Sequence, residues 1–247
     1  MLAERKGCVR YFARIPCGYR DQTILNILAL ETSGDFCSVA LWRDGVIEER
    51  EVSAGQRQSG LLLDMVHELL AACGEKPGAL DGIAFGAGPG SFTGLRVACG
   101  VTQGLALGLD KPVVGVGTLQ ALAEATGAPR VVCCVDARMS EVYHAAYEKI
   151  DGEWRTVQAP GVHAPGDVPP LVGDGWLGCG NGFAVYGDAL RARYGGQLSG
   201  IRETLHARAR EIAILAAAVF ARGGGVRAEL AAPHYVRDKV ALMTHER

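Results

Sequence analysis

The chain has 247 residues, of which 49% are hydrophobic, so it is long enough to bury one large core or two smaller ones. Its formal net charge of -2 shows no basic excess, which argues against strong nucleic-acid binding by this chain alone. The eight cysteines contain no Cys-x-x-Cys pair and no Cys/His zinc spacing. This pattern favours reduced, buried thiols in a cytoplasmic protein over disulfides or a zinc site.

The first segment, residues 1–23, has neither sustained apolar periodicity nor the long apolar run of a signal peptide. We interpret it as an extension outside the fold. Three strands are then expected over residues 24–30, 37–42 and 46–52. The last two are joined at Asp44-Gly45, a favoured pair for a hairpin turn, so the three strands form an antiparallel unit.

An amphipathic helix is expected over residues 59–73, because apolar residues recur there at helical spacing. A buried strand over 80–85 and a glycine-rich turn over 86–94 precede a second helix, which ends near Gly108.

The second helix is apolar on most sides and carries Gly100, Gly104 and Gly108 at every fourth position. Each mid-helix glycine costs roughly 1 kcal/mol relative to alanine, so we expect another backbone to approach this face closely. The sequence therefore predicts a sheet against one side of the helix and a second helix layer, supplied by another protein, against the other.

The pattern then repeats. An acid follows the first strand and a hairpin closes at Asp-Gly in both halves, at Glu31 with Gly45 and at Asp136 with Gly152. Such a repeat outranks local signals in choosing a fold. It predicts an α/β protein of the two-lobed actin-like plan, with duplicated βββαβα lobes and a reduced second lobe. The remaining predicted segments are a first lobe over 24–117, a second lobe over 118–230 that ends in a helix over 204–222, and a C-terminal tail over 231–247.

Proteins of the actin-like plan bind ATP between the lobes, where two acid-led hairpins with glycine two residues after the acid hold phosphates and metal. Here Ser33 and Arg138 stand where those glycines would be, so neither backbone can close on a phosphate. A glycine cluster at Gly178 and Gly180 could face an adenosine. The expected site is a vestigial cleft with at most weak ATP or ADP binding, formed by Glu31, Thr32, Ser33, Asp136, Arg138, Gly178 and Gly180.

Several local features have two interpretations each. The turn that begins at Gly86 is either an anion cradle or a structural turn between strand and helix. Arg96 is either an anion clamp or part of a surface salt bridge. Glu31, Asp136 and Glu141 are either a carboxylate set with Arg138 as partner, or turn-capping and solvated side chains. No serine lies in Gly-x-Ser-x-Gly, so no catalytic residue is assigned.

Five segments together resemble the TsaB (YeaZ) family over residues 24–247, and the second and fourth are the most specific. They are Ile27-Leu28-Ala29-Leu30-Glu31-Thr32-Ser33, Gly86-Ala87-Gly88-Pro89-Gly90-Ser91-Phe92-Thr93-Gly94-Leu95-Arg96, Gln103-Gly104-Leu105-Ala106, Val135-Asp136-Ala137-Arg138-Met139-Ser140-Glu141-Val142-Tyr143 and Pro233-His234-Tyr235-Val236-Arg237.

The resemblance implies a non-catalytic, dimerising subunit. With the catalytic subunit TsaD and the ATPase TsaE, such a protein forms the bacterial complex that transfers a threonylcarbamoyl group to an adenosine beside the tRNA anticodon. The chain would form a homodimer when alone, contact tRNA only through the complex and bind no membrane. The catalytic relative holds a metal with His-x-x-x-His, whereas this region has only Gln58, Gly60 and His67, so no metal site is expected.

In the family, the helices that correspond to 59–73 and 93–108 pack against TsaD or a second TsaB. The partner-binding residues expected from this are Leu62, Met65, Val66, Leu69, Thr93, Val97, Gly100, Val101, Gly104 and Gly108.

Two main hypotheses follow. In the first, the chain is a scaffold that stabilises a catalytic partner. In the second, it is an independent ATPase or small-molecule kinase, with Glu31 and Asp136 holding metal and phosphates. A protease is opposed by the absence of a metal pair and of a recognisable triad.

Overall fold

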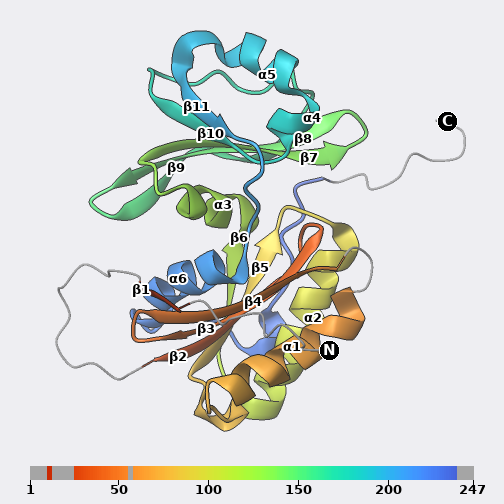
Figure 1. The fold of residues 1–247 in the computed structure, drawn as a ribbon, viewed down its shortest axis with the longest axis vertical. Coiled ribbons are helices and arrows are strands. Elements are labelled where there is room, and N and C mark those ends of the chain that lie inside the picture. Colours follow the sequence, from red (N-terminus) through yellow and green to blue (C-terminus); the bar gives the residue numbers. More distant parts are fainter. Residues whose placement is uncertain (1–9, 13–24, 55–57, 238–247) are drawn as a thin grey trace, which may run out of the picture.

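The computed structural model describes residues 10–12, 25–54 and 58–237, arranged as two lobes that stand one above the other in Figure 1. The lower lobe contains a six-stranded sheet in the order β1-β4-β3-β2-β5-β6. Its strands are β1 (Arg10–Phe12), β2 (Asn26–Glu31), β3 (Phe36–Arg43), β4 (Val46–Ser53), β5 (Gly82–Gly88) and β6 (Val113–Gly117). Helices α1 (Gln58–Ala72) and α2 (Phe92–Leu109) cover one face of this sheet.

The upper lobe contains a five-stranded sheet in the order β11-β10-β7-β8-β9. Its strands are β7 (Arg130–Arg138), β8 (Glu141–Ile150), β9 (Glu153–His163), β10 (Trp176–Cys179) and β11 (Leu198–Arg202). Its short helices are α4 (Gly182–Val185) and α5 (Gly187–Tyr194). Two longer helices, α3 (Thr118–Thr126) and α6 (Ala209–Phe220), follow β6 and β11.

The two sheets repeat one topology. The order β4-β3-β2-β5-β6 in the first lobe corresponds strand for strand to β9-β8-β7-β10-β11 in the second. In each, an antiparallel three-strand unit is followed by two parallel strands. Residues 164–175 connect β9 to β10 without a helix, so α1 has no counterpart in the second copy. The predicted duplication with a reduced second lobe is confirmed.

The closing helix of each copy packs against the sheet of the other copy. Helix α3 ends the first copy, and its Leu119 and Leu122 lie in the core of the second sheet with Val131. Helix α6 ends the second copy, and its Ile212 and Ala213 lie in the core of the first sheet. Because each helix completes the neighbouring core, the exchange joins the two lobes at the base of the space between them.

The predicted lobe boundaries need two corrections. Helix α6 and the short helix η4 (Ala228–Leu230) pack on the first lobe, so the second lobe does not extend to residue 230. The last helix also begins at Ala209 rather than at residue 204, because residues 203–208 form the connection between lobes.

The predicted extension 1–23 does not lie wholly outside the fold, because Arg10–Phe12 pairs antiparallel with β4 as an edge strand. Residues 1–9 and 13–24 lie outside the described residues, as do residues 238–247 of the predicted tail. None of the helices in the described part of the chain is long and apolar enough to cross a lipid bilayer.

His144 on β8 is a buried polar residue in the core of the second lobe, with no exposed surface. Neither ring nitrogen has a hydrogen-bond partner, and the rings of His163 and Tyr194 lie 5.7 and 6.5 Å away, centroid to centroid. Burial, together with repulsion from His163, lowers the pKa of His144 to about 4. The neutral imidazole is therefore the form that the folded lobe accommodates.

We predict that His144 makes the chain less stable as the pH falls. Its pKa is about 6.5 in the unfolded chain and about 4 in the folded chain, so the unfolded state binds more protons between these values. Stability is lost as the pH falls through this window, by about 2 kcal/mol between pH 7 and pH 5. Urea unfolding of the wild type and of His144→Phe at both pH values should show that this loss is smaller in the variant. Equal losses in the two proteins would contradict the prediction.

Candidate functional site

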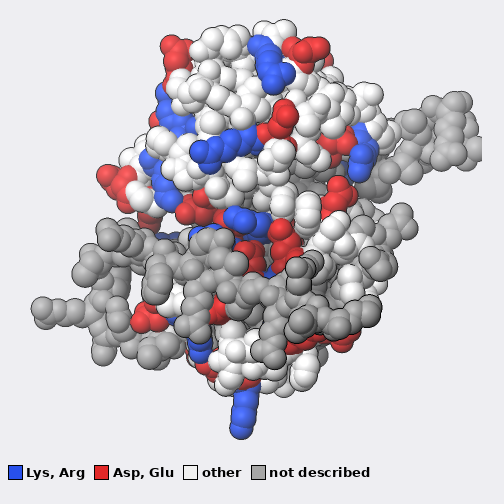
Figure 2. All heavy atoms as spheres, viewed as in Figure 1, with Lys and Arg blue, Asp and Glu red and all other residues white. Residues whose placement is uncertain are grey.

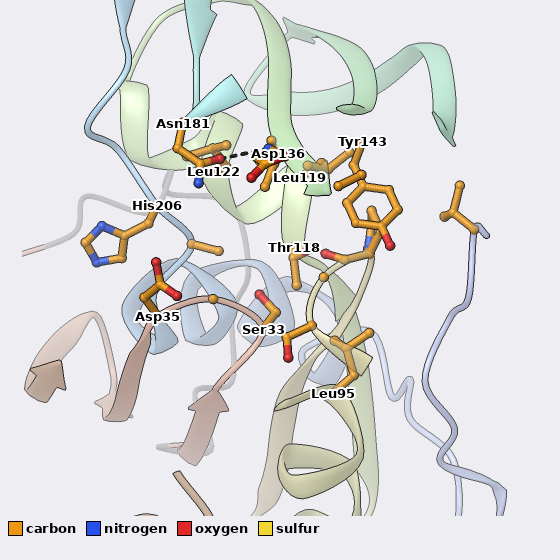
Figure 3. A pocket seen from close by; sticks show the side chains of 18 of the residues that line it. Ser33, Asp35, Leu95, Thr118, Leu119, Leu122, Asp136, Tyr143, Asn181 and His206 are labelled. Atoms are coloured by element: carbon orange, nitrogen blue, oxygen red, sulfur yellow. Dashed lines mark hydrogen bonds between the residues drawn. The ribbon is translucent and has the colours of Figure 1, made fainter. Parts of the chain in front are cut away.

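A cavity of about 740 Å³ lies between the two lobes. Its walls come from the turn after β2, the loop after β5, the β7–β8 hairpin, the connection between β11 and α6, and residues 234–237. Figure 3 shows Ser33, Asp35, Asp136, Asn181 and His206 around this space, with Leu119, Leu122 and Tyr143 adding apolar surface. The cavity occupies the position of the predicted cleft, and both acid-led turns contribute to its wall.

The first turn uses its polar groups within the chain. The backbone N–H of Ser33 donates to the Glu31 carboxyl, and the carbonyl of Ser33 accepts from the N–H of Ser91 at 2.8 Å. A Cβ at Gly90 would lie 2.6 Å from the Ser33 Cβ, so the loop after β5 rests directly on this turn. Thr32 is also buried and donates its hydroxyl to the carbonyl of Gly94 at 2.7 Å. The backbone donor that would meet a phosphate is therefore already engaged.

The second turn is closed in the same manner. Asp136 Oδ1 accepts from the N–H of Arg138 at 2.9 Å and from the hydroxyl of Tyr186 at 3.1 Å, and Oδ2 pairs with Arg138 Nη1 at 3.0 Å. The backbone N–H of Asp136 donates to Asn181 Oδ1 at 2.9 Å. This confirms turn capping as the role of Asp136, with both carboxylate oxygens held by its own chain.

Glu31 lies beneath the cavity, with 2% of its surface exposed. Burial raises its pKa to about 7, although the Ser33 hydrogen bonds oppose the shift. Its Oε2 has no hydrogen-bond partner, and a Cβ at Gly86 would lie 1.7 Å from that oxygen. Gly86 is therefore needed to make room for a carboxyl group. This favours the structural interpretation of the glycine turn over the anion cradle.

The glycine cluster of the second lobe packs against its own chain rather than facing the cavity. A Cβ at Gly178 would lie 2.8 Å from the ring of Phe183, and one at Gly180, where φ is +100°, would lie 2.4 Å from the carbonyl of Cys134. Neither glycine lines the cavity, so the predicted adenosine-facing role is wrong. Asn181, which directly follows Gly180, is the residue that reaches the cavity.

The predicted carboxylate set does not assemble. Glu31 is buried, Asp136 pairs with Arg138, and Glu141 pairs instead with Arg237 near the C-terminal end of the described chain. Within the described residues, no three His, Cys, Asp or Glu side chains gather in a way that could hold a metal ion. The three acids of the predicted set therefore have separate surroundings and do not form one site.

The contacts of Arg96 within the described chain are with two aromatic side chains rather than with the carboxylate of a surface salt bridge. Its guanidinium lies 3.6 Å from the centre of the Phe92 ring, and its Nε donates to the hydroxyl of Tyr235 at 2.9 Å. Sequence reasoning did not assign His206, Tyr143 or residues 234–237 to the cavity wall. Tyr143 and residues 234–237 lie in segments that carried the family resemblance, whereas His206 gives no sequence signal. Its ring stacks on Phe36 at 4.1 Å, a contact between segments far apart in the chain.

The predicted partner-binding residues divide into two groups. Leu62, Met65, Val66 and Leu69 of α1 are 0–6% exposed and pack in the core beneath the helix. Their assignment to a partner surface is wrong, because the apolar stripe of α1 faces its own sheet.

The α2 residues of the predicted set lie toward the outside. Gly100, Gly104 and Gly108 are exposed, and a Cβ at each would meet nothing within 4 Å. Thr93 is exposed, while Val97 and Val101 are partly buried. Leu107 on α2 and Leu63 on α1 are 73% and 53% exposed. We call these eight residues, Leu63, Thr93, Val97, Gly100, Val101, Gly104, Leu107 and Gly108, the α2 face.

Comparison with known proteins identifies the family. The family model for TsaD, tRNA N6-adenosine threonylcarbamoyltransferase, matches residues 52–244. The protein named tRNA threonylcarbamoyladenosine biosynthesis protein TsaB from Escherichia coli is 36% identical over 230 residues, covering 88% of this chain and 96% of that protein. The protein of the same name from Haemophilus influenzae is 38% identical, covering 66% of this chain and 74% of that protein.

Solved structures agree. A crystal structure from Pseudomonas aeruginosa, described as an uncharacterized protein with similarity to peptidase YEAZ, has a TM-score of 0.80 at 38% identity and covers 87% of this chain and 100% of that one. YeaZ from the same organism gives a TM-score of 0.79 at 38% identity, covering 86% of this chain and 100% of that one. The match extends through both lobes, which supports the two-lobed actin-like fold. The chain belongs to the TsaB (YeaZ) family.

Proposed function

We propose that this chain is a non-catalytic scaffold subunit in tRNA threonylcarbamoyladenosine biosynthesis. Two relatives that align across most of their length are named for this pathway, and the matching family model is that of tRNA N6-adenosine threonylcarbamoyltransferase. The observation that carries the scaffold role is the α2 face, where Gly100 and Gly104 inside the helix and Gly108 at its end border open space in the described structure.

The glycines of α2 lower the stability of the helix in the isolated chain. A partner that packs closely against them would offset this cost, which supports a docking role. Each glycine costs roughly 1 kcal/mol in a helix interior, and none of the described residues approaches Gly100 or Gly104 closely enough to require a missing side chain. A second helix packed against this face would need that space. Exposed Leu107 and Leu63 would supply apolar area on either side of the glycines.

The cleft supports the absence of catalysis by this chain. Ser33 donates its N–H to Glu31, and both carboxylate oxygens of Asp136 are held within their turn. A nucleotide would have to displace these hydrogen bonds before meeting a donor or a metal ligand. No specific observation favours the independent ATPase or kinase, and we propose that the chain needs no cofactor.

The proposed partners are a TsaD-like catalytic subunit, a TsaE-like ATPase and, when the chain is alone, a second copy of itself. We place this assembly in the cytoplasm. Figure 2 shows basic and acidic side chains mixed over the visible face of the upper lobe, and the net charge of the chain is -2. Such a face gives little electrostatic attraction to a polyanion, so contact with tRNA is proposed only through the complex.

Replacing Gly104 with leucine should separate docking from folding. The new side chain enters open space on a helix, so thermal stability should stay the same or rise. Against a partner helix it should cost about 1–3 kcal/mol, as in an overpacked core, which weakens binding roughly fivefold or more. Calorimetric titration of the purified chain with a TsaD-like subunit gives the affinity.

The matched control is Gly104→Ala, which changes helix propensity with the smallest added volume and should retain most of the binding. Gly166→Leu provides a second control, because a Cβ there also meets nothing within 4 Å but the residue lies in the second lobe. Undiminished affinity in Gly104→Leu would reject the α2 face as the docking surface.

We also predict that the isolated chain does not bind ATP with magnesium at micromolar affinity, because the groups that would hold phosphates and metal are engaged within the chain. Thermal denaturation with 1 mM ATP and magnesium should leave the melting temperature unchanged. A ligand at 100 times its Kd stabilises by about 2.7 kcal/mol, so tight binding would be plain in this assay. A rise in the wild type that disappears in Asp136→Ala would instead favour the ATPase or kinase.

A further inference from the structure

The scaffold proposal does not use the segment Pro233-His234-Tyr235-Val236-Arg237, although most of this segment lines the cavity. After η4 the chain leaves the first lobe and runs along the mouth of the cavity, where residues 234–237 form part of the wall. Figure 1 shows this blue trace rising from beside α2 and β5 toward the β7–β8 hairpin of the upper lobe. We call residues 231–237 the C-terminal strap.

The strap is anchored on the first lobe at its beginning. The carbonyl of Ala231 accepts from Gln103 Nε2 at 2.9 Å and from Cys99 Sγ at 3.6 Å, both on α2. The N–H of His234 donates to the carbonyl of Ala87 on β5 at 2.6 Å. A Cβ at Gly88, where φ is +119°, would lie 2.6 Å from the His234 carbonyl, so the strap lies flat against the end of β5.

Tyr235 adds an aromatic anchor on the same lobe. Its ring lies 5.6 Å from that of Phe92, and its hydroxyl accepts from Arg96 Nε at 2.9 Å. The Arg96 guanidinium lies over the Phe92 ring and 5.8 Å from the centre of the Tyr235 ring. These three side chains all belong to the strap or to the first turns of α2, so Tyr235 holds the strap to the first lobe.

Arg237 then contacts the second lobe. Its Nη2 pairs with Glu141 at the start of β8, and its Nη1 lies 3.3 Å from the sulfur of Met139. The side chain of Arg237 is only 12% exposed, so this ion pair is screened less than a surface pair. The ion pair fixes the β7–β8 hairpin next to its turn. The turn residues Arg138, Met139 and Ser140 all have positive φ there, between 55° and 62°.

The geometry points to an interlobe latch: the C-terminal strap ties the β7–β8 hairpin to α2 and sets how far the cavity between the lobes opens. The exchanged helices α3 and α6 join the lobes at the base of the cavity. The lobes can therefore separate at the opposite side, which we call the mouth of the cavity. The strap crosses that mouth and holds one end on each lobe. If the strap acts in this way, removing either anchor should increase the mobility of the β7–β8 hairpin.

Hydrogen exchange of the isolated full-length chain tests the latch. Arg237→Ala removes the second-lobe anchor. Tyr235→Ala removes the first-lobe anchor nearest to Arg237 without touching the hairpin, so that the strap is held to the first lobe only as far as His234. Both variants should raise the exchange rate of amides in residues 136–143 by tenfold or more. The radius of gyration from small-angle X-ray scattering should increase in both as the lobes separate.

Three further variants sharpen the comparison. Arg222→Ala breaks the Arg222–Glu153 pair, which also joins residues of the two lobes but is 60% and 78% exposed, so it should change neither measurement. Exchanging the charges with Arg237→Glu and Glu141→Arg together should restore slow exchange. Tyr235→Phe keeps the ring contact and should have a smaller effect than Tyr235→Ala.

Unchanged hairpin exchange in Tyr235→Ala would overturn the latch, because Arg237 would then act only on its local turn. An unchanged radius of gyration in both alanine variants would overturn it as well. No TsaD-like subunit and no nucleotide is present in these measurements, and the radius of gyration is compared between samples of the same oligomeric state, so their outcome is independent of the scaffold proposal. Circular dichroism and the melting temperature establish that each variant is folded before exchange is compared.

Discussion

The exchange of closing helices is the constraint on which the rest of the molecule depends. Each sheet of the duplicated topology lacks a cover on one face until the last helix of the other copy packs there. Ile212 and Ala213 of α6 fill the first core, and Leu119 and Leu122 of α3 fill the second. This brings the β2 turn opposite the β7 turn and creates the cavity between them. The C-terminal strap then adds a third connection at the opposite end of that cavity.

The cavity has the position of an actin-like nucleotide cleft, but the polar groups of its two acid-led turns are engaged within the chain. In a nucleotide-binding cleft, the backbone N–H groups and acidic side chains must be free to bind phosphate and metal. Here Ser33 donates to Glu31, and Asp136 is capped by Arg138, Tyr186 and its own turn. Satisfied hydrogen bonds rigidify the turns, and burial leaves Glu31 with a pKa of about 7. The fold therefore keeps two lobes and a shaped space, while the proposed surface for assembly lies on its outward-facing helix α2.

The sequence predicted the duplication because hairpin turns and acid-led strands follow local rules that survive in both copies. It could not assign α6 to the first lobe, since an apolar helix pattern does not tell which sheet covers it. The same limit explains the error at Leu62 and Leu69, where helical spacing identified a buried stripe but not the protein that buries it. At Gly104 the limit is different. The spacing of glycines along α2 predicts a close neighbour on this face, but it does not show that the space beside Gly104 is open within this chain.

Glu31 and Gly86 show how a buried charge constrains variation elsewhere in the chain. The Oε2 atom of Glu31 occupies the volume that any side chain at position 86 would need. Alanine at position 86 therefore requires either that the Glu31 carboxyl moves or that position 31 carries a shorter side chain. The two positions are coupled, and a library that varies them one at a time would miss pairs of residues that are compatible only together.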